Sequence, residues 1–198
     1  GLSYYDGYSF HTFRDDPDGV SVLSTNRILN IQPTAANNVW CITQDRKLYL
    51  YDTHLCQFLK TSNQINEKFK VDFRADNIYD INGGNTWVTS ANADYLLRTN
   101  DTDVLDFELI HVGQKGLKSG KVYFIYGDKK HREWILTDKG TTIYGKKFST
   151  NVPYKWIREV GEYVFLATEN GKVIVVDEKN RATNVPLPEG ITHINELK

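Results

Sequence analysis

The sequence contains an internal repeat, and this repeat limits the possible architecture more than any other feature. An aromatic residue followed three positions later by Thr or Ser occurs as Trp40 with Thr43, Trp87 with Ser90, Trp134 with Thr137, and Phe165 with Thr168. The first three aromatics are spaced at 47 residues, and the last follows after 31. Periods of about 20 to 50 residues are typical of repeat architectures, and a propeller blade takes about 40 residues. The repeat therefore indicates an array of similar units.

Each repeat contains four short segments with strand character. Two apolar residues spaced three apart precede each aromatic: Ile28 and Ile31, Ile78 and Ile81, Val122 and Ile125, and Ile157 and Val160. Segments rich in β-branched and aromatic residues follow at 47–51, 94–98, 140–144 and 171–175, and a more variable segment comes last, as at 57–59 and 107–110. No window keeps a 3.6-residue apolar period over ten or more residues, so the pattern predicts strands rather than helices.

Four-stranded units cannot bury both faces alone, so they stack around an axis and shield one another. We therefore predict an all-β fold of β-propeller blades, each a four-stranded antiparallel sheet, in a single segment (1–198) that forms a partial propeller of about four to five blades. The predicted blades cover 21–70, 71–115, 116–150 and 151–188, with partial blades at 1–20 and 189–198. The repeated aromatics are then expected to fill the space between adjacent sheets as structural core: Trp40, Trp87, Trp134 and Phe165.

Composition excludes several function classes. The 24 basic and 25 acidic side chains give a net charge of -1, which provides no field for gathering nucleic acid. No stretch approaches the roughly 20 apolar residues that span a bilayer, so we expect membrane contact only through a parent protein. The chain contains no Met, even at its first position, and we interpret it as a piece of a longer protein.

Residues that carry catalytic or metal chemistry form no recognised pattern, so we predict no catalytic residue, metal or cofactor for this segment. The five histidines are scattered without ligand spacing. Cys41 and Cys56 could form one bridge, but Cys41 lies in a strand-like run, which favours a buried free thiol. The run Asp15–Gly19 resembles a calcium loop, yet it lacks the alternating ligands and the final glutamate of an EF-hand, which argues against a calcium site.

Candidate ligand-binding residues lie just before each predicted innermost strand, because in propellers this connection faces the central channel. The pairs there are Asn26 with Arg27, Asp76 with Asn77, Gly120 with Lys121, and Lys155 with Trp156. Arg, Asn and Lys bind sugar hydroxyls or acid groups, and an aromatic ring stacks on a sugar ring. The predicted ring of ligand-binding residues is Arg27, Asn77, Lys121 and Trp156. A competing interpretation is that these residues only complete turns, with Trp156 replacing a core aromatic.

A second feature with two interpretations is the basic run Lys129–Arg132 before Trp134. It could contact an anionic sugar or a partner protein. A solvated turn has the same composition.

The N-terminal stretch resembles a known repeat family. The matching residues are Gly1-Leu2-x-x-Tyr5-Asp6-Gly7-Tyr8-x-Phe10, Phe13-Arg14-x-Asp16-Pro17-Asp18 and Leu23-Ser24-x-Asn26-x-Ile28-x-x-Ile31. They resemble the periplasmic two-component regulator propeller repeats of hybrid two-component sensor histidine kinases of gut bacteria. The likeness covers about the first 55 residues, and beyond them only the repeat skeleton continues.

This resemblance implies a sensor rather than an enzyme. Members of the family form seven-bladed propellers followed by an immunoglobulin-like domain, a membrane helix, a kinase, a receiver and a DNA-binding domain. It implies a periplasmic segment that detects a carbohydrate-derived signal and regulates genes for polysaccharide use. The expected partners are an oligosaccharide and another propeller domain or a second copy in a dimer. Two alternatives stay open: a protein-interaction scaffold, and a carbohydrate-active enzyme built on a propeller.

Overall fold

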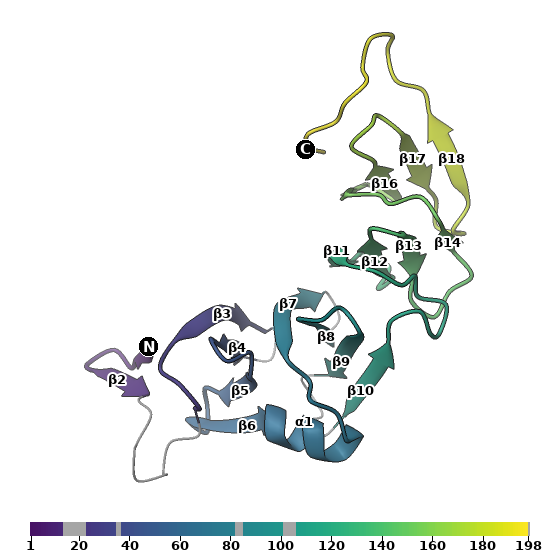
Figure 1. Ribbon diagram of the computed structural model, residues 1–198. Helices are drawn as coiled ribbons and strands as arrows, with labels where there is room; N and C mark the ends of the chain where they lie inside the picture. Colours follow the sequence, from purple (N-terminus) through teal and green to yellow (C-terminus); the bar gives the residue numbers. More distant parts are fainter. Residues whose placement is uncertain (14–22, 35–36, 82–84, 101–105, 198) are drawn as a thin grey trace. The chain divides into compact units, whose positions relative to one another are not determined.

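The computed structural model describes residues 1–13, 23–34, 37–81, 85–100 and 106–197 (Figure 1). The aspartate-rich run Asp15–Gly19 lies outside these residues. By internal contacts the described residues divide into two compact units: the first contains 1–80 and 85–110, and the second contains Ile81 and 111–197. The described residues contain four four-stranded sheets and one two-stranded sheet, so the predicted all-β class of four-stranded antiparallel sheets is confirmed.

The first unit contains the two-stranded sheet and two four-stranded sheets. The strands are β1 (Leu2–Tyr5), β2 (Phe10–Phe13), β3 (Ile28–Pro33), β4 (Asn38–Thr43), β5 (Leu48–Asp52), β6 (Gln57–Thr61), β7 (Ala75–Ile81), β8 (Asn85–Ser90), β9 (Tyr95–Asn100) and β10 (Phe107–His111), the last of which ends at the boundary between the units. Sequential strands are hydrogen-bonded neighbours in every sheet. This up-and-down order follows from the short turns between strands.

The second unit contains two four-stranded sheets of the same order. Their strands are β11 (Val122–Gly127), β12 (Glu133–Thr137), β13 (Gly140–Ile143), β14 (Ser149–Thr150), β15 (Trp156–Val160), β16 (Tyr163–Ala167), β17 (Val173–Val176) and β18 (Ala182–Val185). In the β12–β13 turn, the Thr137 hydroxyl donates to the Gly140 carbonyl at 3.0 Å. The hydroxyls of Thr43 and Thr168 lie 3.2 and 3.3 Å from the equivalent carbonyls, of Lys47 and Lys172, and form shorter bonds of 2.6 Å to Asp45 and Asn170 in the same turns. The repeated Thr therefore closes the hairpin after the aromatic strand.

Between its two four-stranded sheets, the first unit has a core centred on Trp40. The indole is fully buried among side chains of both sheets, including Leu50, Val88 and Leu97. The face of the sheet β3–β6 that points away from Trp40 packs against the hairpin β1–β2. There the ring centres of Phe13 and Tyr51 are 4.9 Å apart. Trp87 is also fully buried. In the first unit, two stacked sheets therefore bury Trp40, as expected for neighbouring units of a repeat.

In the second unit Trp134 is fully buried and packs against Val164 and Leu166 of the next sheet. Phe165 differs from the predicted core position, because it is only half-buried. Successive side chains of a strand point to opposite faces, so Phe165 faces away from Trp134. The segment after β18, residues 186–197, contains no strand.

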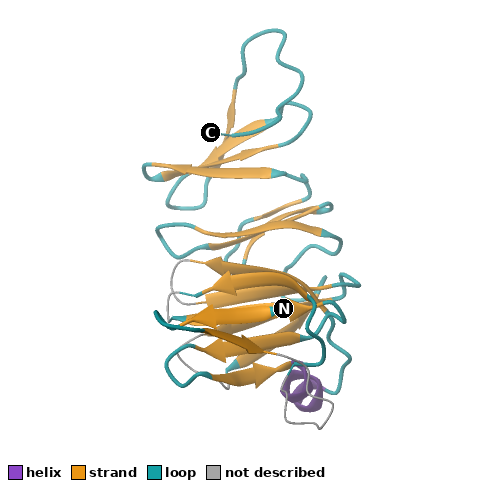
Figure 2. Ribbon diagram, turned by 90° about the vertical axis from the view of Figure 1, so that its left-hand side faces the viewer, coloured by secondary structure: helices purple, strands orange, loops and turns teal. Residues whose placement is uncertain are grey.

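One helix in the described part, α1 (Ser62–Phe69), was not expected from the sequence (Figure 2). It joins β6 to β7 and inserts the fully buried Ile65 into the core around Trp40. The helix has eight residues, so its apolar period is too short to be recognised in a window of ten or more residues. Short helices also depend on tertiary packing for stability. None of the helices in the described ranges is long and apolar enough to span a membrane.

Cys41 and Cys56 are both free thiols, one buried and one exposed. Burial raises the pKa of the Cys41 thiol to about 12, and the thiolate is the reactive form. We expect an aromatic disulfide reagent at pH 8 to label one thiol per native chain and two per unfolded chain. Cys56→Ser would then remove the native reaction. Rapid labelling of Cys41 in the native Cys56→Ser variant would contradict this assignment.

Candidate functional site

A backbone hydrogen bond recurs at the entry to the innermost strand of three sheets. In each case the residue directly after the repeated Thr or Ser donates its N–H to the carbonyl of the residue just before the strand. The pairs are Gln44 to Arg27 at 2.7 Å, Ala91 to Arg74 at 2.8 Å, and Asp138 to Lys121 at 3.0 Å. The accepting residue is basic every time, so this bond fixes a cationic side chain at the same end of each sheet.

In the fourth sheet the corresponding backbone bond runs in the opposite direction, from the residue before the strand to the residue before the repeated Thr. Lys155 directly precedes β15, and its N–H donates to the Ala167 carbonyl at 2.9 Å. Each of the four innermost strands is thus preceded by Arg or Lys.

The structure corrects two of the four predicted positions. Arg27 and Lys121 directly precede their strands and are exposed, with Arg27 Nη1 donating to Gln44 Oε1 at 3.1 Å. Asn77 instead lies inside β7, because this strand begins at Ala75, three residues before the first apolar residue of the pair. Its side-chain amide donates to the Asp76 carboxylate at 3.2 Å.

Trp156 is the first residue of β15 rather than the residue before it. It is half-buried and lies opposite Ala167 in the register. The structure thus shows a contact between Arg27 and Gln44. The ligand-binding role of Arg27, Asn77, Lys121 and Trp156 stays a prediction.

A pocket of about 500 Å³ lies beside Lys155 in the second unit. Its lining comes from the starts of β11 and β15, the β16–β17 turn and the C-terminal segment: Tyr123, Val152, Pro153, Lys155, Thr168, Glu169, Asn170, Lys172, Thr192 and His193. The C-terminal segment is held there because the Ile194 N–H donates to the Glu169 carbonyl at 3.0 Å. We call this the Lys155 pocket.

The Lys155 pocket combines charge, hydrogen-bonding groups and an aromatic ring. The Lys155 ammonium forms an ion pair with Glu169 and lies 5.9 Å from the centre of the Tyr123 ring. Hydrogen bonding to Glu169 raises the pKa of Lys155, and the same bond lowers the pKa of Glu169, so both groups are charged at neutral pH. The Thr168 hydroxyl donates to Asn170 Oδ1 at 2.6 Å, which leaves the Asn170 amide N–H groups as donors.

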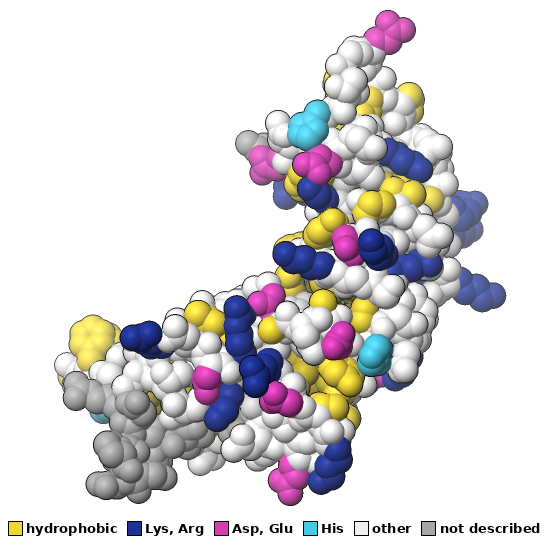
Figure 3. Space-filling view, in the orientation of Figure 1, with side chains coloured by type: hydrophobic (Ala, Val, Ile, Leu, Met, Phe, Trp, Pro, Cys, Tyr) yellow, Lys and Arg dark blue, Asp and Glu magenta, His cyan; other side chains and the backbone are white. Residues whose placement is uncertain are grey.

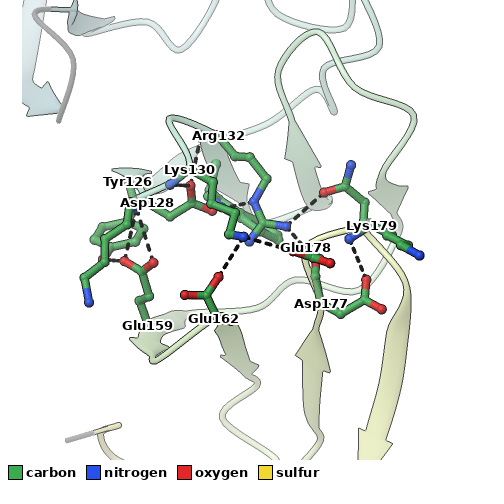
Figure 4. Close-up of polar contacts among 12 residues, drawn as sticks. Tyr126, Asp128, Lys130, Arg132, Glu159, Glu162, Asp177, Glu178 and Lys179 are labelled. Atoms are coloured by element: carbon green, nitrogen blue, oxygen red, sulfur yellow. Dashed lines mark hydrogen bonds and ion pairs between the residues drawn. The ribbon is translucent and has the colours of Figure 1, made fainter.

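The basic run Lys129–Arg132 has a different role, because it connects the two sheets of the second unit (Figure 4). Lys130 Nζ lies 2.7 Å from Glu162 and 3.1 Å from Glu178. The backbone N–H of Lys129 donates to the Glu159 carboxylate at 3.2 Å. The ammonium of Lys130 is therefore paired within the unit, with carboxylates from the turns after β15 and β17.

Beneath this run lies a buried polar network. Asp128 is fully buried, and its Oδ2 accepts from Arg132 Nε at 2.5 Å and from Trp134 Nε1 at 2.8 Å. Arg132 Nη1 also donates to the Asp177 carbonyl at 2.7 Å and to Asn180 at 3.0 Å. A buried charge requires such partners, so this network joins the core tryptophan to the neighbouring sheet.

Elsewhere on the face shown in Figure 3, basic and acidic side chains are interspersed. Among the described residues no three His, Cys, Asp or Glu side chains are grouped as metal ligands.

The solved structures that this chain resembles identify its fold. No family model and no curated protein sequence matches it. It is similar to the extracellular domain of BT3049, a proposed hybrid two-component system of B. thetaiotaomicron, with a TM-score of 0.58 and 18% identity. It is also similar to virginiamycin B lyase from Staphylococcus aureus, with a TM-score of 0.52 and 15% identity, and to YCF48 bound to D1 peptide, with 0.52 and 12%. The chain folds as blades of a β-propeller.

The likeness covers most of this chain but only part of the others. The match to BT3049 covers 95% of this chain and 25% of the BT3049 chain. The match to the lyase covers 82% of this chain and 56% of the lyase, and the match to YCF48 covers 90% of this chain and 58% of YCF48. The neighbours thus include the extracellular domain of a two-component system, an enzyme and a peptide-bound protein on related folds, and a shared fold does not determine function.

Sequence reasoning missed Arg74 and did not select Lys155, Glu169 or Tyr123. The signal for Arg74 was present, since Arg27, Arg74 and Lys121 each lie 13 residues before the tryptophan of their repeat. The apolar pair Ile78 and Ile81 placed the strand start too late. No comparable spacing points to Tyr123, because the pocket is assembled from segments far apart in the sequence.

Proposed function

We propose that this chain is a propeller segment of the extracytoplasmic sensor of a hybrid two-component histidine kinase, and that it binds an oligosaccharide in the Lys155 pocket. The observation that carries this proposal is the composition of that pocket. A volume of about 500 Å³ accommodates a short saccharide, since small-molecule sites measure about 300 to 1,000 Å³. The fold likeness to the extracellular domain of BT3049 supports the sensor role.

The charges of the pocket favour an acidic sugar. The lining contains Lys155 and Lys172 and a single carboxylate, that of Glu169, so the three groups sum to one positive charge. Asn170 offers donors for hydroxyl oxygens, and Tyr123 offers a ring face for stacking on a sugar. A uronic acid unit carries the carboxylate, the hydroxyls and the ring face that these groups recognise.

In such a sensor the ligand would act by favouring one arrangement of the extracytoplasmic region over another. A ligand shifts an equilibrium only by its difference in affinity between the two states. Regulation of polysaccharide-use genes and phosphotransfer would require other domains of the parent protein. Its location would be periplasmic, with the membrane crossed elsewhere in the parent.

The decisive test is ligand-dependent stability. A matching acidic oligosaccharide at 100 times its Kd should raise the free energy of unfolding by about 2.7 kcal/mol. Lys155→Ala should reduce the affinity at least about tenfold, because it removes a charge-assisted hydrogen bond. Lys147→Ala, which changes an exposed lysine outside the pocket, should bind as the native chain does.

The measurement is isothermal titration calorimetry with acidic and neutral oligosaccharides, alongside thermal unfolding and a reducing-end assay for cleavage. Binding without cleavage supports the sensor proposal. Cleavage would favour a carbohydrate-active enzyme. A folded chain that binds none of the sugars, or binds equally well as Lys155→Ala, would overturn the proposal and favour a protein-interaction scaffold.

A further inference from the structure

We propose that the first unit carries a second anionic-sugar site, centred on Arg74, that matches the Lys155 pocket in position and chemistry; this inference rests on the proposed function. A pocket of about 630 Å³ opens there. Its lining consists of Lys70, Val71, Asp72, Arg74, Ala91, Asn92 and Tyr95. We call it the Arg74 pocket.

The repeat places the two pockets at equivalent positions. Arg74 directly precedes β7, as Lys155 directly precedes β15. Asn92 follows Ser90 by two residues, as Asn170 follows Thr168. Both pockets therefore form where the entry of an innermost strand meets the turn between the second and third strands.

The two pockets also contain the same set of chemical groups. In the Arg74 pocket, Arg74 Nε lies 2.9 Å from the carboxylate of Asp72. The Lys155 pocket likewise contains an ion pair, although its carboxylate, that of Glu169, comes from the turn after β16 rather than from the segment before the innermost strand. Each pocket adds a further exposed lysine, Lys70 in the first unit and Lys172 in the second.

Each pocket further contains one asparagine and one tyrosine. In the Arg74 pocket the Asp94 carboxylate accepts from Asn92 Nδ2 at 2.7 Å, which orients the amide. Tyr95 is half-buried against the core around Trp40, so its ring is held in place while part of it lines the pocket.

These groups define the ligand class. Among the lining residues, Lys70, Arg74 and Asp72 sum to one positive charge, as Lys155, Lys172 and Glu169 do in the Lys155 pocket. The Asp94 carboxylate is not part of the lining, and it is hydrogen-bonded to the Asn92 amide. The position of Glu169 in the Lys155 pocket is occupied by Ala91 in the Arg74 pocket, which therefore has one acceptor fewer for sugar hydroxyls. The Arg74 guanidinium remains, and its planar donors suit a carboxylate. The Arg74 pocket thus fits a uronic acid unit, and one chain would bind two such units.

The test is an NMR titration of the whole chain with trigalacturonic acid, following the side-chain amide signals of Asn92 and Asn170. We expect both signals to shift with saturation in the native chain. Arg74→Ala should weaken the response of Asn92 at least about tenfold and leave that of Asn170 unchanged. Lys155→Ala should do the reverse, and Lys147→Ala should affect neither. The backbone bond from Ala91 to Arg74 survives the substitution, so Arg74→Ala should remain folded.

The outcomes separate this inference from the proposed function. A response of Asn170 alone, lost only in Lys155→Ala, would overturn the second site and keep the proposed function. A response of Asn92 alone, lost only in Arg74→Ala, would keep the second site and remove the Lys155 pocket. Equal responses to neutral trigalactose would overturn the anionic class, and silence of both signals would overturn both proposals.

Discussion

Trp40→Ala should lower the free energy of unfolding by about 3–5 kcal/mol, the range for removing a large aromatic side chain from a packed core. The indole is fully buried between the two four-stranded sheets of the first unit, where Leu50, Val88 and Leu97 surround it. The substitution leaves a cavity that these aliphatic side chains cannot fill, because they belong to strands fixed by their ladders.

Chemical denaturation measures this loss, and hydrogen exchange locates it. Exchange should accelerate first in β3 to β10, which form the affected core. Phe165→Ala is the matched control, since Phe165 occupies the equivalent repeat position but is half-buried. Its loss should stay below about 2 kcal/mol. Equal losses for the two variants would contradict the assignment of Trp40 to the core and of Phe165 to a partly open face.

Asp128→Ala should cost a similar amount, about 3–5 kcal/mol, by a different mechanism. Its carboxylate accepts from Arg132 and Trp134 in the interior of the second unit. Removing it leaves the Arg132 guanidinium, whose side chain is 6% exposed, without its carboxylate, and leaves the indole N–H of Trp134 without an acceptor. Unpaired buried groups lose their full hydration energy.

Asp128→Asn separates charge from hydrogen bonding. The amide oxygen still accepts one hydrogen bond but carries no charge, so the loss should be smaller than for alanine. Double mutation of Asp128 and Arg132 to Asn and Met should recover part of the stability, because no unpaired charge remains buried. Urea unfolding of the four chains measures these differences. A loss below about 1 kcal/mol for Asp128→Ala would show that water or another group replaces the carboxylate.

The strands could be predicted from the sequence because their signal is local. β-Branched and aromatic runs bounded by turn residues recur with the tryptophans, and β3, β11 and β15 begin within a residue of the expected apolar pairs. β7 starts earlier because Ala75 and Asp76 extend its ladder without contributing to the apolar pattern. α1 could not be predicted for the related reason that its stability depends on placing Ile65 in a core formed by distant strands.

The candidate site could be predicted only in part. The expectation that ligand-binding residues directly precede the innermost strands depends on chain position alone. It selected Arg27 and Lys121, which do precede their strands but line neither the Lys155 pocket nor the Arg74 pocket. The Lys155 pocket depends on a tyrosine from one sheet, a turn from the next and a C-terminal segment, and no spacing rule brings these together. Burial of Phe165 likewise depends on what covers its sheet face, which its own strand does not specify.

The backbone bond at the entry of the innermost strands has a consequence for how such repeats diversify. It joins an N–H to a carbonyl, so it tolerates almost any side chain at either position, and Gln44, Ala91 and Asp138 already occupy the donor position in three repeats. Mutations there can change the side chains at the strand entry while the hairpin stays closed. Side chains at these positions could therefore diverge between repeats with little penalty in folding, and duplication of a repeat would copy a variable position along with its scaffold.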